Sequence, residues 1–100
     1  MIIYSVEISI AKKVQAKWLK WMRETHIPDV MRTNMFVKFS FYKKLHTSNS
    51  ETYIIEYETD DMKKYQKYES DFAIKLKKEH ETKFTNQFSA KRSLFIKKII

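Results

Sequence analysis

Residues 4–22 read YSVEISIAKKVQAKWLKWM, and the spacing of their apolar side chains changes once along the stretch. Up to residue 10 every second side chain is apolar, which predicts a strand with one buried face. From Ala11 onward, Val14, Trp18 and Met22 follow a helical period, and the lysines between them fall largely on the outer side. The sequence therefore predicts a strand that leads directly into a helix.

This helix is expected to stop near His26 or Ile27, because the residue before a proline disfavours helical backbone. Pro28 then suits the first position of a further short turn that reaches Arg32. Alternation and helical spacing recur after this turn. They predict a second strand over residues 36–45, a polar loop over His46–Ser50, a third strand around residues 53–57, a second helix from residue 62 toward His80 and a fourth strand over 88–96.

The predicted order is strand, helix, two strands, helix, strand, without a linker, so a single domain over residues 1–100 is expected. Two right-handed crossovers around a central hairpin give an α+β, ferredoxin-like βαββαβ fold, in which a four-stranded antiparallel sheet carries both helices on one face. The other face is predicted to hold Phe, Tyr and Ile side chains. An exposed apolar face of this kind favours a homodimer that packs sheet against sheet.

The composition excludes several classes of site. The chain has no cysteine and no glycine, which rules out thiol nucleophiles, Cys-bearing zinc sites, phosphate-binding P-loops and dinucleotide-binding fingerprints. His26, His46 and His80 have no histidine four residues away, so no metal site is predicted, and no cofactor is expected either.

The net charge of +8 is compatible with a nucleic-acid partner, but only Arg23, Arg32 and Arg92 among the 20 basic residues are arginine. Arginine is the residue that reads phosphates and bases with two hydrogen bonds, so the lysine excess fits a coding bias toward A/T-rich codons better. Aromatic residues predicted on the sheet, which include Phe39 and Tyr57, could stack on RNA bases. The glycine-bearing motif of RNA-recognition modules is absent, however, and a nucleic-acid partner is not favoured. No stretch is apolar enough for a membrane helix, and a cytoplasmic location is expected.

Four segments carry a resemblance to a known family: WLKWMRETHIPDV (residues 18–30), YQKY (65–68), LKKEHE (76–81) and FSAKRSL (88–94). They resemble a small bacterial family known only as a domain of unknown function, which is grouped with the dimeric α/β barrels of ferredoxin-like fold. The resemblance implies the same fold and dimerisation, and it carries over no catalytic residue. Similar proteins often have glycine near Asn34, in the hairpin turn and near Asn86. Asparagine tolerates the left-handed backbone that such turns require.

His26 and Asp29 form the strongest local pair for catalysis, because a carboxylate can orient a histidine or raise its pKa. The plain alternative is that Asp29 caps the turn after Pro28 while His26 bonds to the backbone. Arg92 is the second candidate, since its alternation places it on a mainly apolar strand face. It is expected either to form a salt bridge with Glu7, Glu56 or Glu58, or to bind a ligand anion.

Trp21, Tyr57 and His80 are candidate ligand contacts, although each is more simply explained as part of the core or of a helix end. In haem-degrading members of the wider superfamily, a helix histidine works beside an asparagine and a tryptophan; here the first strand offers no asparagine and both tryptophans are on the first helix. The sequence therefore predicts a homodimer of unknown function that binds a small molecule between sheet and helices. The alternative is a cofactor-independent monooxygenase- or isomerase-like enzyme, with His26 as base and Arg92 holding an anion.

Overall fold

The change of apolar spacing near Ala11 marks the junction of the first strand and the first helix. The computed structural model describes residues 1–47 and 50–100. Its strands are β1 (Ile2–Ile10), β2 (Lys38–Lys43), β3 (Glu51–Thr59) and β4 (Phe88–Ile96). Its helical segments are η1 (Lys12–Val14), α1 (Gln15–Trp21), η2 (Met22–His26), α2 (Ile27–Met31), α3 (Met62–Tyr68), η3 (Glu69–Ala73) and α4 (Ile74–Lys83). Within the predicted polar loop, Ser48 and Asn49 lie outside the described residues. The strand predicted over residues 36–45 is shorter than expected at both ends.

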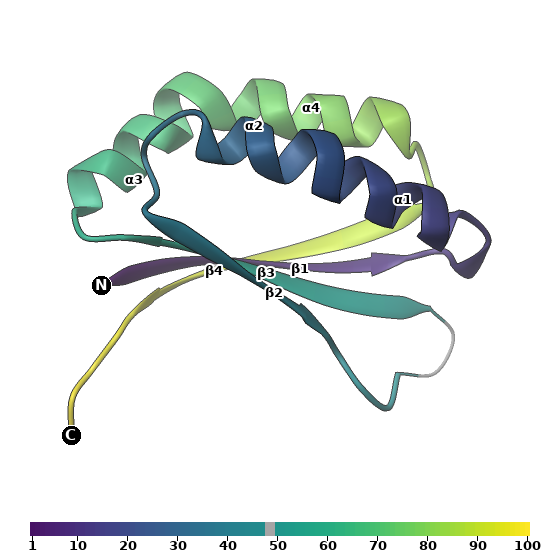
Figure 1. Cartoon of the computed structure of the whole chain (residues 1–100), viewed down its shortest axis with the longest axis horizontal. Coiled ribbons are helices and arrows are strands. Elements are labelled where there is room, and N and C mark those ends of the chain that lie inside the picture. The colour runs from purple at the N-terminus through teal and green to yellow at the C-terminus, as the bar shows by residue number, and fades with distance from the viewer. Residues whose placement is uncertain (48–49) are drawn as a thin grey trace.

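The four strands form an antiparallel sheet in the order β2-β3-β1-β4, and all the helices cover one of its faces (Figure 1). The predicted α+β, ferredoxin-like fold is therefore confirmed. Alternate residues of β1 and β3 face the helices, and they build a core in which Trp18 and Phe84 are fully buried. Among the described residues, no helix has the length and apolar character needed to cross a membrane.

The uncovered face of the sheet is more polar than the sequence predicted. Strand register places on this face the residues Ile3, Ser5, Glu7, Ser9, Lys38, Ser40, Tyr42, Thr52, Ile54, Glu56, Glu58, Ser89, Lys91, Ser93 and Phe95. The expected Phe, Tyr and Ile side chains are present there as Phe95, Tyr42, Ile3 and Ile54, but they lie among polar residues because the other aromatic residues of β2 and β3 alternate onto the helix-covered face. Phe41 contacts Trp18 there, and Tyr57 is buried under the helices. The aromatics that suggested RNA stacking therefore do not form an open platform.

The predicted helix stop near His26 is also wrong. The chain stays helical through Pro28 because η2 is a π-helical turn, in which the Ile27 N–H bonds to the Met22 carbonyl five residues back. A second π-helical turn, η3, interrupts the other helix. Such turns are rare and occur frequently at functional sites.

Both π-helical turns can be recognised in the sequence by the spacing of buried residues, which is five positions across each turn. Met22 and Ile27 are buried on either side of η2, and Tyr68 and Ala73 across η3. An uninterrupted α-helix would repeat its buried face after three or four residues.

Three turns use positive φ without glycine: Asn34 (63°), His46 (61°) and Asn86 (60°). The expectation that asparagine takes the left-handed positions near residues 34 and 86 is confirmed. At the hairpin the position is held by a histidine, which is less common there than asparagine but still enriched relative to most residues.

Candidate functional site

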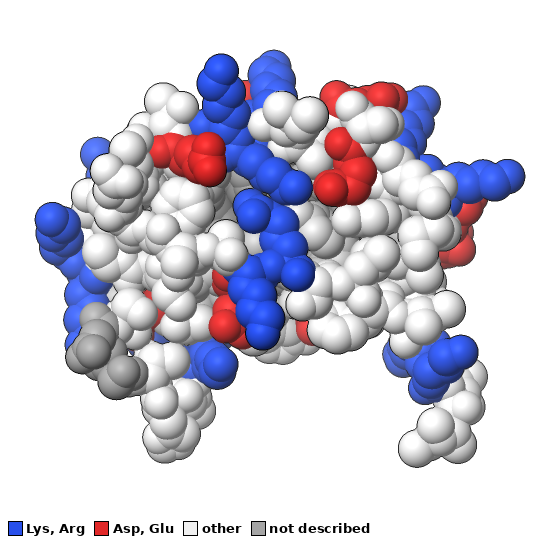
Figure 2. All heavy atoms as spheres, turned by 180° about the vertical axis from the view of Figure 1, so that it is seen from behind, with Lys and Arg blue, Asp and Glu red and all other residues white. Residues whose placement is uncertain are grey.

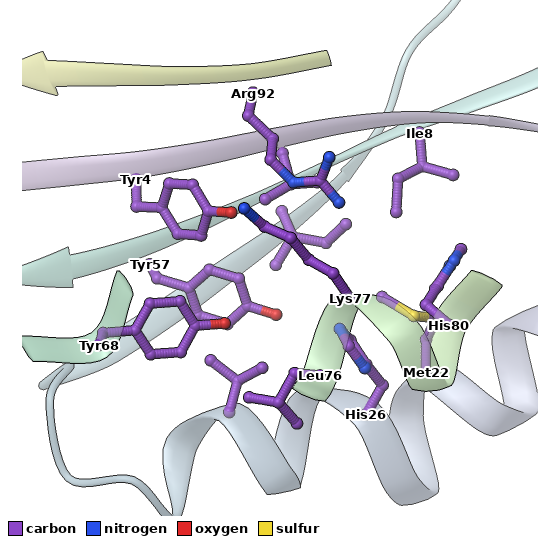
Figure 3. Close-up of a pocket in the computed structure, with 13 residues that line it drawn as sticks. Tyr4, Ile8, Met22, His26, Tyr57, Tyr68, Leu76, Lys77, His80 and Arg92 are labelled. Carbon is purple, nitrogen blue, oxygen red and sulfur yellow. The ribbon is translucent and has the colours of Figure 1, made fainter. Parts of the chain in front are cut away.

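A small cavity of about 30 Å³ lies between the sheet and the helices, beside the two π-helical turns. Its walls are built from β1, β3, β4, η2, α2, α3 and α4, with the side chains Tyr4, Val6, Ile8, Met22, His26, Val30, Ile55, Tyr57, Tyr68, Leu76, Lys77, His80 and Arg92. Figure 3 shows the tyrosines at one side of this space, the histidines and Met22 at the other, and the two cations between them. A space of this size holds one or two water molecules.

The mouth of the cavity lies at Lys77 and Arg92, whose polar ends converge with the hydroxyl group of the buried Tyr4 in Figure 3. Burial raises the pKa of Tyr4 to about 12, and the neighbouring Arg92 opposes that shift. Lys77 lies 3.7 Å from Oε1 of Glu69, the first residue of η3. The other carboxylate oxygen of Glu69 is buried without a hydrogen-bond partner. On this side of the molecule, basic side chains gather in a band that runs from the helices toward the sheet (Figure 2).

The tyrosines behind the mouth are neutral phenols at physiological pH. Burial raises the pKa of Tyr57 well above its ordinary value, and burial also raises the pKa of Tyr68. Their hydroxyl groups point toward the interior of the cavity in Figure 3. Neutral phenols of this kind can donate hydrogen bonds to a bound oxygen atom.

The inner end of the cavity is an aromatic and histidine cluster. Trp18 donates a hydrogen bond of 2.9 Å from its indole N–H to Nε2 of His80, so that histidine is neutral and carries its proton on Nδ1. The His26 ring stacks on Trp21 at 5.0 Å and lies 5.7 Å from the His80 ring. The Nδ1 atom of His26 is buried without a hydrogen-bond partner.

Burial lowers the pKa of both histidines. For His26 the pKa falls to about 4, and the nearby Asp29 charge opposes the shift without overcoming it. For His80 it falls to about 3, with His26 and Arg92 adding to the effect of burial. Asp29 thus acts on the pKa of His26 in the direction that the sequence suggested, but burial outweighs it and the net shift is downward. Asp29 instead forms an exposed ion pair with Arg32, and α2 has no side-chain cap.

Arg92 lies on the helix-covered face of the sheet, opposite Val6 in the strand register. Glu7, Glu56 and Glu58 alternate onto the opposite face, so the expected salt bridge to one of them is wrong. β4 is an edge strand, which leaves the Arg92 side chain exposed at the mouth of the cavity.

The structure brings four of the six candidate residues to one cavity: His26, Arg92, His80 and Tyr57. Trp21 lies behind them against the two histidines, whereas Asp29 is outside the cavity. Sequence reasoning missed Lys77, Tyr4 and Tyr68 as site residues. Their spacing along β1 and the second helix could have indicated that they face the space between sheet and helices. Nothing in the sequence, however, distinguishes a residue that lines a cavity from one that packs in the core.

A bound molecule could form a hydrogen bond with Nδ1 of His26 at the inner end of the cavity. An oxygen anion could lie beside Arg92 and Lys77 at its mouth. No cluster of three or more His, Asp or Glu side chains within residues 1–47 and 50–100 is arranged to hold a metal ion. Both tryptophans contact His80 in space, so their place on the first helix does not separate them from this histidine as the sequence suggested.

Residues 1–98 match the family described as a domain of unknown function, DUF4286. No curated protein matches the chain. A solved structure described as a dimeric ferredoxin-like protein from an uncultured marine organism is similar, with a TM-score of 0.65 and 18% identity over 100% of this chain and 99% of that one.

Two further structures bear on how much the fold implies. A cofactor-independent oxygenase, SnoaB from Streptomyces nogalater, has a TM-score of 0.65 and 13% identity over 99% of this chain and 95% of that one. A de novo designed protein, Foldit4, has a TM-score of 0.63 and 11% identity over 97% and 98%. A designed chain shares the architecture almost as closely as an enzyme, so the likeness shows the fold alone.

Proposed function

Because this chain belongs to the DUF4286 family of unknown function, its role has to be argued from its own cavity, and we propose that the charged mouth of this cavity binds the carboxylate of a small organic acid. One observation carries the proposal. Arg92 and Lys77 converge at the mouth of a cavity whose inner end holds a histidine nitrogen without a hydrogen-bond partner. Buried polar atoms in folded proteins nearly always have a partner, so a bound molecule or water is expected at His26.

The charges at the mouth favour an anion. Lys77 pairs with the carboxylate of Glu69, whereas Arg92 makes no ion pair within residues 1–47 and 50–100 and is the cation left to hold an anion. A carboxylate matches the planar guanidinium of Arg92 through two parallel hydrogen bonds. The phenol groups of Tyr4 and Tyr68 supply further donors beside it.

The proposal is tested by titrating the protein with acetate, butyrate and benzoate and following amide chemical shifts by NMR. Shifts are expected around the cavity, and Arg92→Gln should weaken binding about tenfold or more, the scale of a charged hydrogen bond. Lys91→Gln is the matched control, because this neighbouring cation of β4 faces the opposite side of the sheet. Equal effects of the two substitutions would refute a specific role for Arg92.

A second candidate is a cofactor-independent oxygenase- or isomerase-like enzyme. It is supported by the common cavity of His26 and Arg92 and by the similarity to SnoaB. The lowered pKa of His26 makes it a weak base, which places this candidate behind simple binding. Oxygen uptake with an electron-rich phenol, abolished by both His26→Gln and Arg92→Gln, would reverse that order.

We also propose that the hundred residues form one domain that pairs with a second copy through the open face of the sheet. Similar structures are described as dimeric. The short side chains of Ser5, Ser9 and Thr52 on the two central strands of this face would allow two sheets to approach closely. A cytoplasmic location remains a prediction of the sequence.

A further inference from the structure

A second hollow lies on the other side of η2 and α2, at the edge of the sheet formed by β2. It is a groove of about 460 Å³, lined by Leu19, Met22, Arg23, Ile27, Pro28, Met31, Phe39 and Phe41. Seven of these eight side chains are apolar. Phe39 remains 45% exposed there, so the groove presents apolar surface to water.

Met22 belongs to both hollows. It is buried, and it lines the groove as well as the cavity that contains His26 and Arg92. Met22 is the residue that the linings of the two hollows share. Its side chain is unbranched, has three rotatable bonds and adapts its shape readily, so movement of this one side chain offers a path between them.

We propose that Met22 is a movable partition and that the acid bound by this protein carries an extended apolar tail. The carboxylate lies between Arg92 and Lys77, and the tail passes Met22 into the groove. This inference rests on the proposed function, since it uses the same cations to hold the acid group.

The sizes of the two hollows support a shared ligand. The cavity alone, at about 30 Å³, admits little more than water, whereas typical ligand pockets measure roughly 300–1,000 Å³. The groove alone has that size but offers almost no polar partner to orient a ligand. Joined at Met22, the two provide a charged end and an apolar end, which is the pattern of an amphipathic acid.

Other occupants fit the groove less well. A peptide segment would bring backbone N–H and C=O groups against apolar walls that cannot pair them. Arg23 is the charged residue of the lining, and it gives a nucleic acid little to bind. An alkyl or aryl tail leaves no polar group unsatisfied.

The test compares acetate, butyrate, octanoate and dodecanoate with dodecanol by calorimetry, below the concentration at which each forms micelles. Once the tail reaches the groove, the dissociation constant should fall by about fourfold for each further methylene group buried. Dodecanol should bind more weakly than dodecanoate, and Arg92→Gln should remove that difference.

Two variants locate the tail. Phe39→Ser should abolish the increase in affinity from butyrate to dodecanoate. Ile74→Ser, at an exposed apolar residue of α4 outside the groove, is the control and should preserve this increase. Met22→Leu keeps the side-chain volume but is branched and less mobile. Met22→Leu should weaken the binding of dodecanoate more than the binding of butyrate.

The outcomes separate the two proposals. If butyrate binds in an Arg92-dependent manner but longer acids gain nothing, the partition is refuted and the proposed function stands. If the binding of no acid depends on Arg92, both the proposed function and the partition are refuted. If dodecanol binds as tightly as dodecanoate, the groove is an apolar site unconnected with the cations, and the inference is overturned.

Discussion

His26 and His80 are neutral in the folded protein because their rings are packed among Trp21, Phe84 and each other. Desolvation disfavours the charged imidazolium, and the Arg92 charge disfavours it further. A pair of buried neutral histidines is a useful partner for hydrogen bonding, since each ring offers one donor and one acceptor. Protonation of either ring at low pH is therefore expected to destabilise the folded state.

The stability of the protein should fall as the pH drops from about 6.5 toward 4. The pKa values of His26 and His80 in the folded state lie below the ordinary 6.5, so the unfolded chain binds more protons in this interval. The free energy of unfolding should therefore decrease by up to about 1.4 kcal/mol per pH unit for each histidine, and the loss should be absent above pH 7. Urea unfolding at pH 7, 6 and 5 measures it.

Two variants assign this pH dependence. His26→Gln should reduce the slope by about half, because glutamine does not titrate and His80 remains, whereas His46→Asn replaces an exposed histidine at a turn and should leave the slope intact. An identical slope in all three proteins would attribute the acid sensitivity to carboxylates instead.

The site could be predicted from single residues only in part. The alternation of β4 placed Arg92 on the face of Phe88 and Ala90, and the register agrees. The meeting of His26 with His80 could not be predicted, because it depends on how two helices far apart in sequence lie across the sheet. The position of Lys77 at the mouth of the cavity could not be predicted either, because it also depends on how the second helix lies across the sheet.

Among the elements, the turn between α4 and β4 places Asn86 at a φ of 60°, in the left-handed region that glycine and asparagine adopt more readily than other residues. Asn86→Ala should reduce the free energy of unfolding by about 1 kcal/mol, because an alanine in the left-handed region is strained. Asn86→Gly should leave it unchanged or raise it slightly. Chemical denaturation compares the three proteins, and equal stabilities would show that this turn tolerates either residue.

Strands were more predictable than helices for a physical reason. Alternation fixes which face a strand residue occupies, so β1 and β4 follow the sequence closely. The π-helical turns depend on one extra residue per helix, and only the five-residue spacing of buried side chains, such as Met22 to Ile27, indicates them. The rule that proline disfavours a helical residue before it was outweighed here by burial of Ile27 and Val30.

For the whole molecule, the proposed pairing predicts particles of twice the 12.2 kDa chain mass at micromolar concentration in sedimentation equilibrium. Ile54→Lys should dissociate them, since it places a charge at the centre of the open face. Ile74→Lys, at an exposed position of α4 on the helical side, is the matched control and should remain paired. A wild-type protein that sediments as a monomer would contradict the proposed interface.

The sheet order β2-β3-β1-β4 leaves β2 and β4 with one free hydrogen-bonding edge each. Both edge strands carry exposed apolar residues, Phe39 on one and Phe95 on the other, which makes them potential templates for fibril growth. Lys38 and Lys43 on β2, like Lys91 on β4, would lie beside equal charges if identical edges joined. Charged side chains on edge strands, lysine above all, oppose such edge-to-edge pairing, and we expect this benefit from the edge lysines without any binding partner.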